Sequence, residues 1–269
     1  MKKLILLFLF LYSVACLTFY INQESYVFRS SDWWRPPPMD LNVEELFINV
    51  EENIKLHAWL LKKPNSQRTI IFFHGNGGNI TERLWQLDIF DKLNVQTILF
   101  DYRGYGLSDG KIKSVDDLYN DSRYVYNYVV DSLNVPQDQI ILWGRSLGGA
   151  IASKLASEVK TTQSLILEGT FSEIEPLVYH VLPFTKYLPM SLLFKYFDFN
   201  NVRNVKNLKN DILILHSIND DLISYKHAEE IFDACNGNAE LVELKGTHRR
   251  YQFESYDKYY KSLEIFLTK

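Results

Sequence analysis

At 269 residues the chain is long enough for a sizeable core, and 46% of its residues are hydrophobic, 14% aromatic and 23% charged. This composition is typical of a globular protein and excludes a disordered or collagen-like chain. The formal net charge of −4 lacks the basic excess of a nucleic-acid-binding surface, so we expect no nucleic-acid partner. The two cysteines, Cys16 and Cys235, form neither a CxxC pair nor a Cys/His zinc set. We therefore expect no internal disulfide and no metal site.

The N-terminus is a candidate membrane segment. Lys2 and Lys3 precede residues 4–21, a run of eighteen residues without a charge. As a helix rising about 1.5 Å per residue, the run spans roughly 27 Å, which is close to the hydrocarbon core of a bilayer. It also lacks the polar face of a helix that packs on a domain. Because the paired lysines favour a cytoplasmic N-terminus, we expect residues 1–21 to be a single-pass anchor, with the following domain on the non-cytoplasmic side.

Two alternatives for this segment stay open. Ser13-Val14-Ala15 places small residues where a signal peptidase cuts, and Cys16 follows in the manner of a lipoprotein cysteine. Such a site usually carries Leu where Ser13 stands. The chain is then either a lipoprotein anchored at Cys16 or a secreted protein.

Residues 22–40 are predicted to connect the anchor to the domain. Pro36-Pro37-Pro38 favours polyproline geometry, and neither a helix nor a sheet ladder can continue through it. Beyond residue 41 no linker or repeat divides the sequence, so we predict one domain over residues 41–269.

The pattern of this domain is typical of a doubly wound α/β fold. Alternating polarity over Glu45–Lys62 predicts an antiparallel hairpin. Short apolar runs that follow predict buried parallel strands at Thr69–Phe73, Gln96–Phe100, Gln139–Trp143, Ser164–Leu167, Ile212–Leu215 and Glu240–Leu244. Helical segments such as Asp116–Ser132 lie between most of them. We therefore predict a mostly parallel central sheet with helices on both faces.

The most informative motif is G-x-S-x-G, which follows the third of the predicted parallel strands. Gly144 and Gly148 flank Ser146 at spacings of two residues, and a helix of small residues follows. Glycines are needed there because the turn brings backbone close to backbone. Chance alone can produce the five-residue pattern, but its place between strand and helix predicts a nucleophile elbow. We predict Ser146 as the nucleophile.

A serine hydroxyl needs a base and an orienting acid, which follow on such a sheet in the order Ser, Asp or Glu, His. The strand at Ile212–Leu215 leads into an acidic loop that offers Asp220 and Asp221, unless that loop is only a solvated turn. His248 follows the last strand and reaches the same edge of the sheet. We predict His248 as the base, with His227, on a predicted helix, as the rival.

Attack on a carbonyl creates an oxyanion that needs two hydrogen-bond donors. The backbone amide of Leu147 is predicted to be one donor, and the amide of Asn76 in the Gly-rich turn His74–Asn79 to be the other. The competing idea, a nucleotide-binding loop, fails because neither the P-loop nor the G-x-G-x-x-G pattern is present, and Ile80 stands where the third Gly is needed. We expect His74 to fix the geometry of the turn.

Several motifs together resemble the BEM46-like family, membrane-anchored serine hydrolases of the α/β-hydrolase superfamily. These motifs are HGNGGN from His74, DYRGYGLSDG from Asp101, GRSLGG from Gly144, LHSINDD from Leu215 and GTH from Gly246. The likeness runs from about Tyr26 to the C-terminus and implies the α/β-hydrolase fold. It implies the triad Ser146, Asp220 and His248.

The resemblance favours Asp220 over Asp221, because the acid of the family follows a strand-end His by four residues, as Asp220 follows His216. The chain departs from the family at Ser217, where Gly is common, and after His248, where two arginines stand in place of an Asn. Neither departure removes a member of the triad.

These features predict a serine hydrolase that cleaves small-molecule carboxylic esters or thioesters through an acyl-enzyme on Ser146, with no cofactor. Residues 171–200, rich in Phe, Tyr, Leu and Pro, predict a lid for apolar acyl chains or, equally, helices packed on the sheet. A peptidase using the same triad is one alternative function. A catalytically silent protein that uses the fold for binding or scaffolding is the other.

Overall fold

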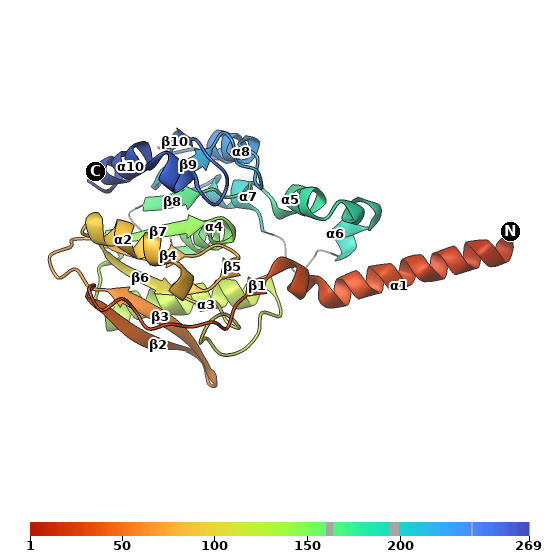
Figure 1. The fold of residues 1–269 in the computed structure, drawn as a ribbon, viewed down its shortest axis with the longest axis horizontal. Coiled ribbons are helices and arrows are strands. Elements are labelled where there is room, and N and C mark those ends of the chain that lie inside the picture. Colours follow the sequence, from red (N-terminus) through yellow and green to blue (C-terminus); the bar gives the residue numbers. More distant parts are fainter. Residues whose placement is uncertain (160–163, 194–198, 238, 269) are drawn as a thin grey trace.

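The computed structural model describes residues 1–159, 164–193, 199–237 and 239–268, and a large twisted sheet forms its centre (Figure 1). The strands lie in the order β10-β9-β8-β7-β4-β6-β3-β2. Their bounds are β2 Val43–Glu51, β3 Ile54–Leu61, β4 Thr69–Phe73, β6 Gln96–Phe100, β7 Ile140–Arg145, β8 Ser164–Glu168, β9 Asp211–Ser217 and β10 Ala239–Leu244. Every neighbouring pair from β6 to β10 is parallel, while β2 and β3 are antiparallel to their neighbours. The predicted mostly parallel sheet is confirmed.

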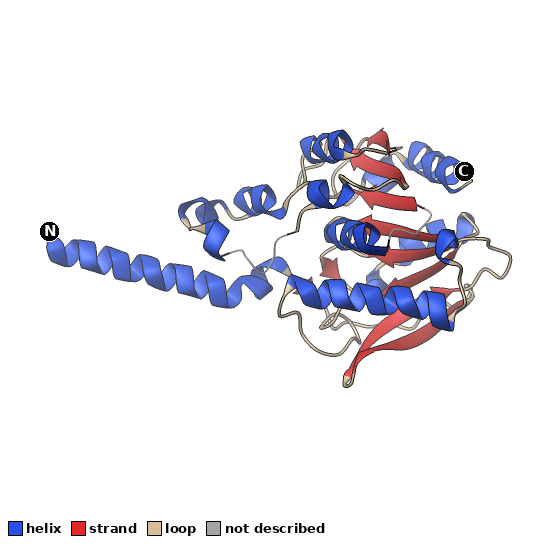
Figure 2. Cartoon of the chain, turned by 180° about the vertical axis from the view of Figure 1, so that it is seen from behind, coloured by secondary structure: helices blue, strands red, loops and turns tan. Residues whose placement is uncertain are grey.

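Helices cover both faces of this sheet, as predicted (Figure 2). The longer helices are α2 Leu84–Lys92, α3 Val115–Asn127, α4 Leu147–Val159, α8 Lys226–Ala234 and α10 Tyr256–Leu267, and the shorter ones are α5 Ile174–Val181, α6 Met190–Leu193, α7 Asn201–Val205 and α9 Tyr251–Glu254. A capping box in which Ser114 and Asp117 satisfy each other's backbone amides starts α3. The predicted helix over Asp116–Ser132 therefore exists, although its last residues form a π-helical turn.

Two apolar cores result, one on each face of the sheet. The first packs α3, α4, α7 and α8 against one set of strand residues, through side chains such as Leu118 and Ile151. The second packs α2 and α10 against the alternate set, through side chains such as Phe90 and Leu263. The central strand β4 is buried along its whole length because both of its faces are covered.

Residues 22–40 were expected to form neither a helix nor a ladder for long. The N-terminal helix α1, Lys2–Val27, extends into this segment, and Arg29–Ser30 form a short strand, β1, parallel to Gly77–Gly78, β5. One prediction about a single segment was wrong. The last predicted strand was expected to be buried, but β10 is an edge strand, and only its final residue, Leu244, is buried.

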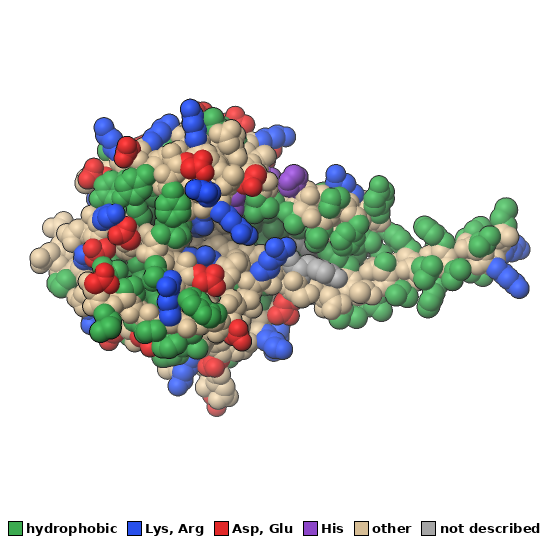
Figure 3. Space-filling view, in the orientation of Figure 1, with side chains coloured by type: hydrophobic (Ala, Val, Ile, Leu, Met, Phe, Trp, Pro, Cys, Tyr) green, Lys and Arg blue, Asp and Glu red, His purple; other side chains and the backbone are tan. Residues whose placement is uncertain are grey.

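The helix α1 projects from the body of the molecule (Figure 1). It is long and apolar enough over Lys2–Ser25 to cross a bilayer, and nearly all of that stretch is exposed. Figure 3 shows apolar side chains along its length and over the neighbouring segment that carries α5 and α6. We call residues 174–193, from the start of α5 to the end of α6, the cap. The predicted lid contains this cap, and residues 194–198 of that prediction lie outside the described residues.

Candidate active site

The turn between β7 and α4 holds Ser146 in a strained backbone conformation. Its φ is +53°, a left-handed value that residues other than glycine rarely adopt. The surroundings enforce this value: the Ser146 amide donates to the Glu168 carbonyl at 2.8 Å, and the Ser146 carbonyl accepts from the Thr170 hydroxyl at 2.7 Å. Such strain is typical of a nucleophile elbow, in which the turn exposes the serine hydroxyl.

The glycines of the motif allow a close approach that no other residue permits. A Cβ on Gly144 would lie 2.3 Å from the carbonyl oxygen of Gly148, and a Cβ on Gly148 would lie 2.0 Å from that of Phe73 at the end of β4. Both neighbours are backbone atoms, which cannot move aside as a flexible side chain can. Gly144 and Gly148 therefore let α4 start against the end of β4, as the motif predicts.

The loops after β9 and β10 bring the predicted acid and base together. Asp220 Oδ2 lies 2.7 Å from Nδ1 of His248, and the Asp220 side chain is fully buried. Asp221 also contacts this histidine, but its carboxylate accepts from the His248 backbone amide at 2.8 Å. Only Asp220 can orient the imidazole ring. Among the described residues no hydrogen bond joins the ring to the Ser146 hydroxyl, a contact that often tightens only when substrate binds.

The loop keeps Asp220 ionised. Its Oδ1 accepts from the backbone amides of Leu222 and Ile223 at 2.9 and 2.8 Å. Burial alone would raise the pKa of Asp220, but the hydrogen bonds from His248 and from these amides outweigh burial and hold that pKa below its usual value. A charged acceptor therefore faces His248 Nδ1, and Nε2 is left free to take a proton.

The loop that carries Asp220 contacts His216, which is fully buried at the end of β9. Its Nε2 donates to the Ile223 carbonyl at 2.8 Å. Burial lowers the pKa of His216, and the carboxylate of Asp220, 3.7 Å away, does not offset this effect. The unfolded chain then binds more protons than the folded one below about pH 6.5, so stability is full above that pH and is lost as the pH falls.

We therefore expect the melting temperature to fall between about pH 7.5 and pH 5.5, and to fall less in His216→Gln, which keeps an amide donor for Ile223. The matched control is His180→Gln, because His180 is exposed on α5. Thermal unfolding of the three proteins at both pH values measures this. An equal fall in His216→Gln and wild type would contradict the assignment of a neutral, buried His216.

The rival base makes other contacts. His227 lies on α8, and its Nδ1 is 2.8 Å from the hydroxyl of Ser172, which also donates to Glu230 at 2.6 Å. Ser172 is 1% exposed, whereas Ser146 is partly exposed. Besides the set Ser146, His248 and Asp220, the structure therefore contains a cluster of Ser172, His227 and Glu230, but Ser172 is buried.

The predicted oxyanion donors flank Ser146. Leu147 is the first residue of α4, and the first amides of a helix have no partner within it. A Cβ on Gly75 would lie 3.3 Å from Cβ of Ser146, so the turn that follows β4 passes directly beside the nucleophile. In the described part of the chain the backbone amide of Asn76 forms no hydrogen bond. Both amides are available to a substrate oxygen.

His74 stabilises this turn from its buried side. Its Nδ1 lies 2.7 Å from the Gly75 carbonyl, and its ring lies 4.3 Å from the ring of Tyr102. Burial, and secondarily the charge of Arg83, lower the pKa of His74 to about 3, so the ring stays neutral at ordinary pH. These contacts are those expected of a residue that fixes loop geometry.

Sequence reasoning missed Arg145, the residue directly before the nucleophile. Its guanidinium donates to the backbone carbonyl of His248 at 2.9 Å and lies 3.2 Å from the carboxylate of Glu168. It also lies over the rings of Trp85 and Tyr251. Arg145 thus joins the loop of the predicted base to the elbow. Its place inside the G-x-S-x-G motif was the only available signal.

Sequence reasoning also missed the side chain of Asn76. Its amide oxygen accepts from the backbone N–H of Arg29 at 3.0 Å, and its amide nitrogen donates to the carbonyl of Val27. Asn79 likewise donates to the carbonyl of Ser31 at 3.0 Å. The chain that leaves α1, residues 27–35, which we call the stem, is therefore fastened to the turn that carries the predicted oxyanion donor.

Known proteins are similar to this chain in sequence. A family model described as serine aminopeptidase, S33, matches residues 64–197. The α/β hydrolase domain-containing protein WAV2 of Arabidopsis thaliana is 28% identical over 251 residues, which cover 87% of this chain and 81% of that protein. The chain has the α/β-hydrolase fold. Protein bem46 of Schizosaccharomyces pombe is 27% identical to this α/β-hydrolase over 208 residues, 74% of this chain and 69% of bem46. The predicted likeness to BEM46-like proteins is confirmed.

Solved structures agree on the fold of this α/β-hydrolase. An esterase of Pyrococcus furiosus superposes with a TM-score of 0.75 at 20% identity, over 89% of this chain and 95% of the esterase. At 20% identity, this structural similarity shows that the esterase and this chain share a fold.

Proposed function

We propose that this α/β-hydrolase is a serine hydrolase that cleaves carboxylic esters or thioesters of small acyl compounds through Ser146. One observation carries the proposal: the ring of His248 is held at 2.7 Å by a buried, ionised Asp220 at the sheet edge where Ser146 stands on its strained turn. This is the arrangement that an activated serine requires. The sequence likeness to the α/β hydrolase domain-containing protein WAV2 supports it as well.

In the proposed reaction, His248 Nε2 takes the proton of the Ser146 hydroxyl as its oxygen attacks the substrate carbonyl carbon. Asp220 holds the imidazole in the required tautomer and stabilises the positive charge that forms on it. The amides of Leu147 and Asn76 receive the negative oxygen. His248 then protonates the departing alcohol or thiol, and a water molecule activated by the same ring releases the acid from Ser146.

The nucleophile is tested by labelling the full-length chain in a mild detergent with a fluorophosphonate, which reacts with activated serines. Wild type is expected to be labelled, and Ser146→Ala is expected to fall to background. Ser172→Ala is the matched control, because it removes the serine that faces the rival His227. We expect it to keep the label.

Labelling that survives in Ser146→Ala and vanishes in Ser172→Ala would move the active serine to the His227 cluster. A folded wild type that takes no label at all would favour the alternative of a catalytically silent binding or scaffold protein. Aminoacyl anilides tested beside esters separate a peptidase from an esterase.

We also propose that residues 1–21 anchor the chain in a membrane, that residues 22–40 connect it and that the catalytic domain, residues 41–269, lies on the non-cytoplasmic side. The apolar surface of α1 supports the anchor, and the paired lysines at the start of α1 support this orientation. The intact mass of the mature, membrane-bound chain tests the anchor, and it is expected to include residues 1–21. A mature chain that begins at a lipidated Cys16, or one that is secreted, would contradict the anchor.

A further inference from the structure

The cap lies against the anchor helix, and both project from the same side of the molecule (Figures 1 and 3). The hydroxyl of Tyr12 on α1 donates to the carbonyl of Tyr187 at 2.8 Å. The ring of Phe19, also on α1, meets the ring of Phe184 edge to face, with centroids 6.4 Å apart. The anchor and the cap therefore form one continuous surface.

These contacts fix the depth that the cap reaches once the anchor is in a bilayer. From Tyr12 to Ile21, the last residue of the apolar run, the helix rises about 14 Å. That is nearly half of a hydrocarbon core of roughly 30 Å. Because Tyr187 is bonded at the level of Tyr12, the cap reaches well into the leaflet that is nearer to the domain.

The chemistry of the cap tip, residues 181–187, suits that depth. Val181, Phe184 and Tyr187 are 40%, 52% and 80% exposed, so much of their apolar surface is left uncovered by the described chain. Two backbone carbonyls of the tip have side-chain donors, which lowers the cost of placing them in hydrocarbon: that of Tyr187 accepts from Tyr12, and that of Leu182 accepts from the Thr185 hydroxyl at 2.6 Å. Its single cation, Lys186, is exposed, and the aliphatic stem of this side chain adds to the apolar surface of the tip.

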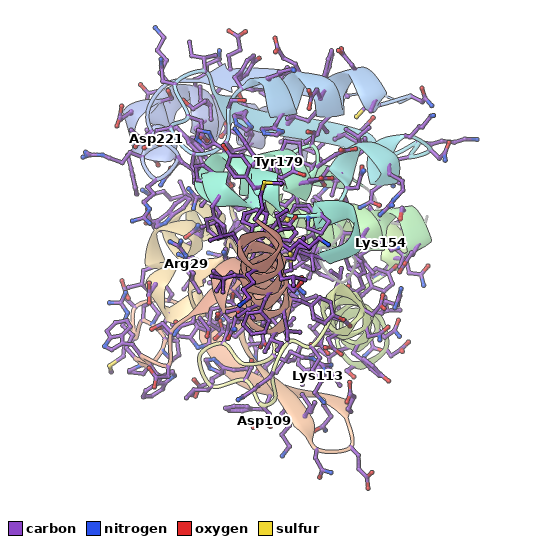
Figure 4. The ribbon with its side chains drawn as sticks, turned by 90° about the vertical axis from the view of Figure 1, so that its right-hand side faces the viewer. Arg29, Asp109, Lys113, Lys154, Tyr179 and Asp221 are labelled. Carbon is purple, nitrogen blue, oxygen red and sulfur yellow. The ribbon has the colours of Figure 1, made fainter. Side chains whose placement is uncertain are left out.

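The proposed active site lies at the same side. Parallel strands β4, β7, β8, β9 and β10 end at the edge from which the stem and the cap leave (Figure 1). Figure 4 looks along α1 onto this side: Arg29 of the stem lies to its left, Tyr179 of the cap lies above it, and Asp221 of the loop after β9 lies further up and to the left. Since Asn76 bonds both Val27 and Arg29, the turn beside Ser146 is held at a fixed distance from the membrane end of the anchor.

We propose that the cap inserts into the leaflet beside the anchor and that the site takes its substrate from that leaflet, as a long-chain acyl ester of a membrane lipid. This inference rests on the proposed function. The acyl chain remains in an apolar environment as the ester group reaches Ser146. The acyl–oxygen bond breaks, the alcohol portion leaves with a proton from His248, and water then releases the fatty acid.

Two independent measurements test the proposal on the full chain in lipid nanodiscs. In the first, a single environment-sensitive dye is attached at Phe184→Cys, in a background with Cys16→Ser and Cys235→Ser. The same dye at Lys261→Cys, exposed on α10, is the control. We expect lipids spin-labelled in their acyl chains to quench the dye at position 184 at least about threefold more than the dye at 261. Equal quenching would overturn the insertion of the cap.

In the second measurement, hydrolysis of a long-chain diacylglycerol held in the nanodisc is compared with hydrolysis of water-soluble p-nitrophenyl acetate. Phe184→Asp is expected to slow the lipid reaction about tenfold or more and to leave the acetate reaction within about twofold. Phe47→Asp is the matched control, because Phe47 is 50% exposed on β2, away from the cap, and is expected to change neither rate.

The two proposals fail in different ways. A wild type that is inert on acetate removes the proposed function, while the quenching still reports where the cap lies. A wild type that hydrolyses acetate but not the embedded lipid overturns the proposed substrate. Equal loss of both activities in Phe184→Asp would show a structural role for this residue and would overturn its role in lipid access.

Discussion

Asp220→Asn is expected to lower kcat for ester hydrolysis by about 10³- to 10⁴-fold, because an amide facing His248 Nδ1 favours the wrong tautomer of the ring. The charge that stabilises the imidazolium is lost as well. The two backbone amides that Asp220 Oδ1 accepts from can still bond the oxygen of an Asn, so the loop keeps its shape. Steady-state kinetics on p-nitrophenyl esters measure the effect, and an unchanged KM would locate it in the chemical step.

Asp221→Asn is the matched control for this experiment. Among the described residues, Asp221 accepts from the backbone amide of His248 alone, and the carbonyl oxygen of an Asn can replace that contact. We expect less than about a threefold change in kcat, because a neutral oxygen still accepts the same bond. If Asp221→Asn proved the more damaging of the two, the acid would have been assigned to the wrong residue.

Gly148→Ala is expected to lower the free energy of unfolding by about 3 kcal/mol or more, the upper range for overpacking. The new Cβ would lie 2.0 and 2.5 Å from the carbonyl oxygen and carbon of Phe73, and 2.7 Å from the carbonyl oxygen of His74. Relief requires the start of α4 to move away from the end of β4. That movement would displace Ser146 from the turn that carries Asn76, so the fraction that still folds is expected to take up little fluorophosphonate.

Gly77→Ala provides the comparison, since a Cβ at Gly77 meets nothing within 4 Å. Its free energy of unfolding should change by less than about 1 kcal/mol, as for other surface substitutions. Denaturant titration of both variants, followed by labelling, separates the effects on stability and on the site. Equal stability and equal labelling in the two variants would contradict the packing described for the elbow.

Local patterns in the sequence predicted most of the fold. Continuous apolar runs such as Thr69–Phe73 are typical of strands covered on both faces, and here they form the centre of the sheet. The edge strand β10 shows the limit of this reasoning. An apolar run such as Leu241 to Leu244 has the same sequence pattern in an edge strand, which pairs with one neighbouring strand, as in a central strand, which pairs with two. The stem strand Arg29–Ser30 is shorter still, and its pairing with Gly77–Gly78 depends on a contact between distant segments.

The same limit applies to the site. The spacing of Gly144, Ser146 and Gly148 encodes a local turn, so the elbow could be predicted from the sequence. Arg145 could not be assigned a role, because its partners, Glu168 and the carbonyl of His248, come from other strands and loops. The side chain of Asn76 is a similar case: its amide was predicted to face a substrate, but its contact with the stem follows only from the path of residues 27–31.

Hydrolysis of p-nitrophenyl esters from acetate to palmitate shows whether Ser146 is an activated nucleophile. The full-length chain in detergent is compared with Ser146→Ala, with melting curves showing that both are folded. We expect wild type to hydrolyse the esters and Ser146→Ala to show only the background rate. A folded wild type that is inert on every ester, or a variant that keeps the wild-type rate, would contradict it.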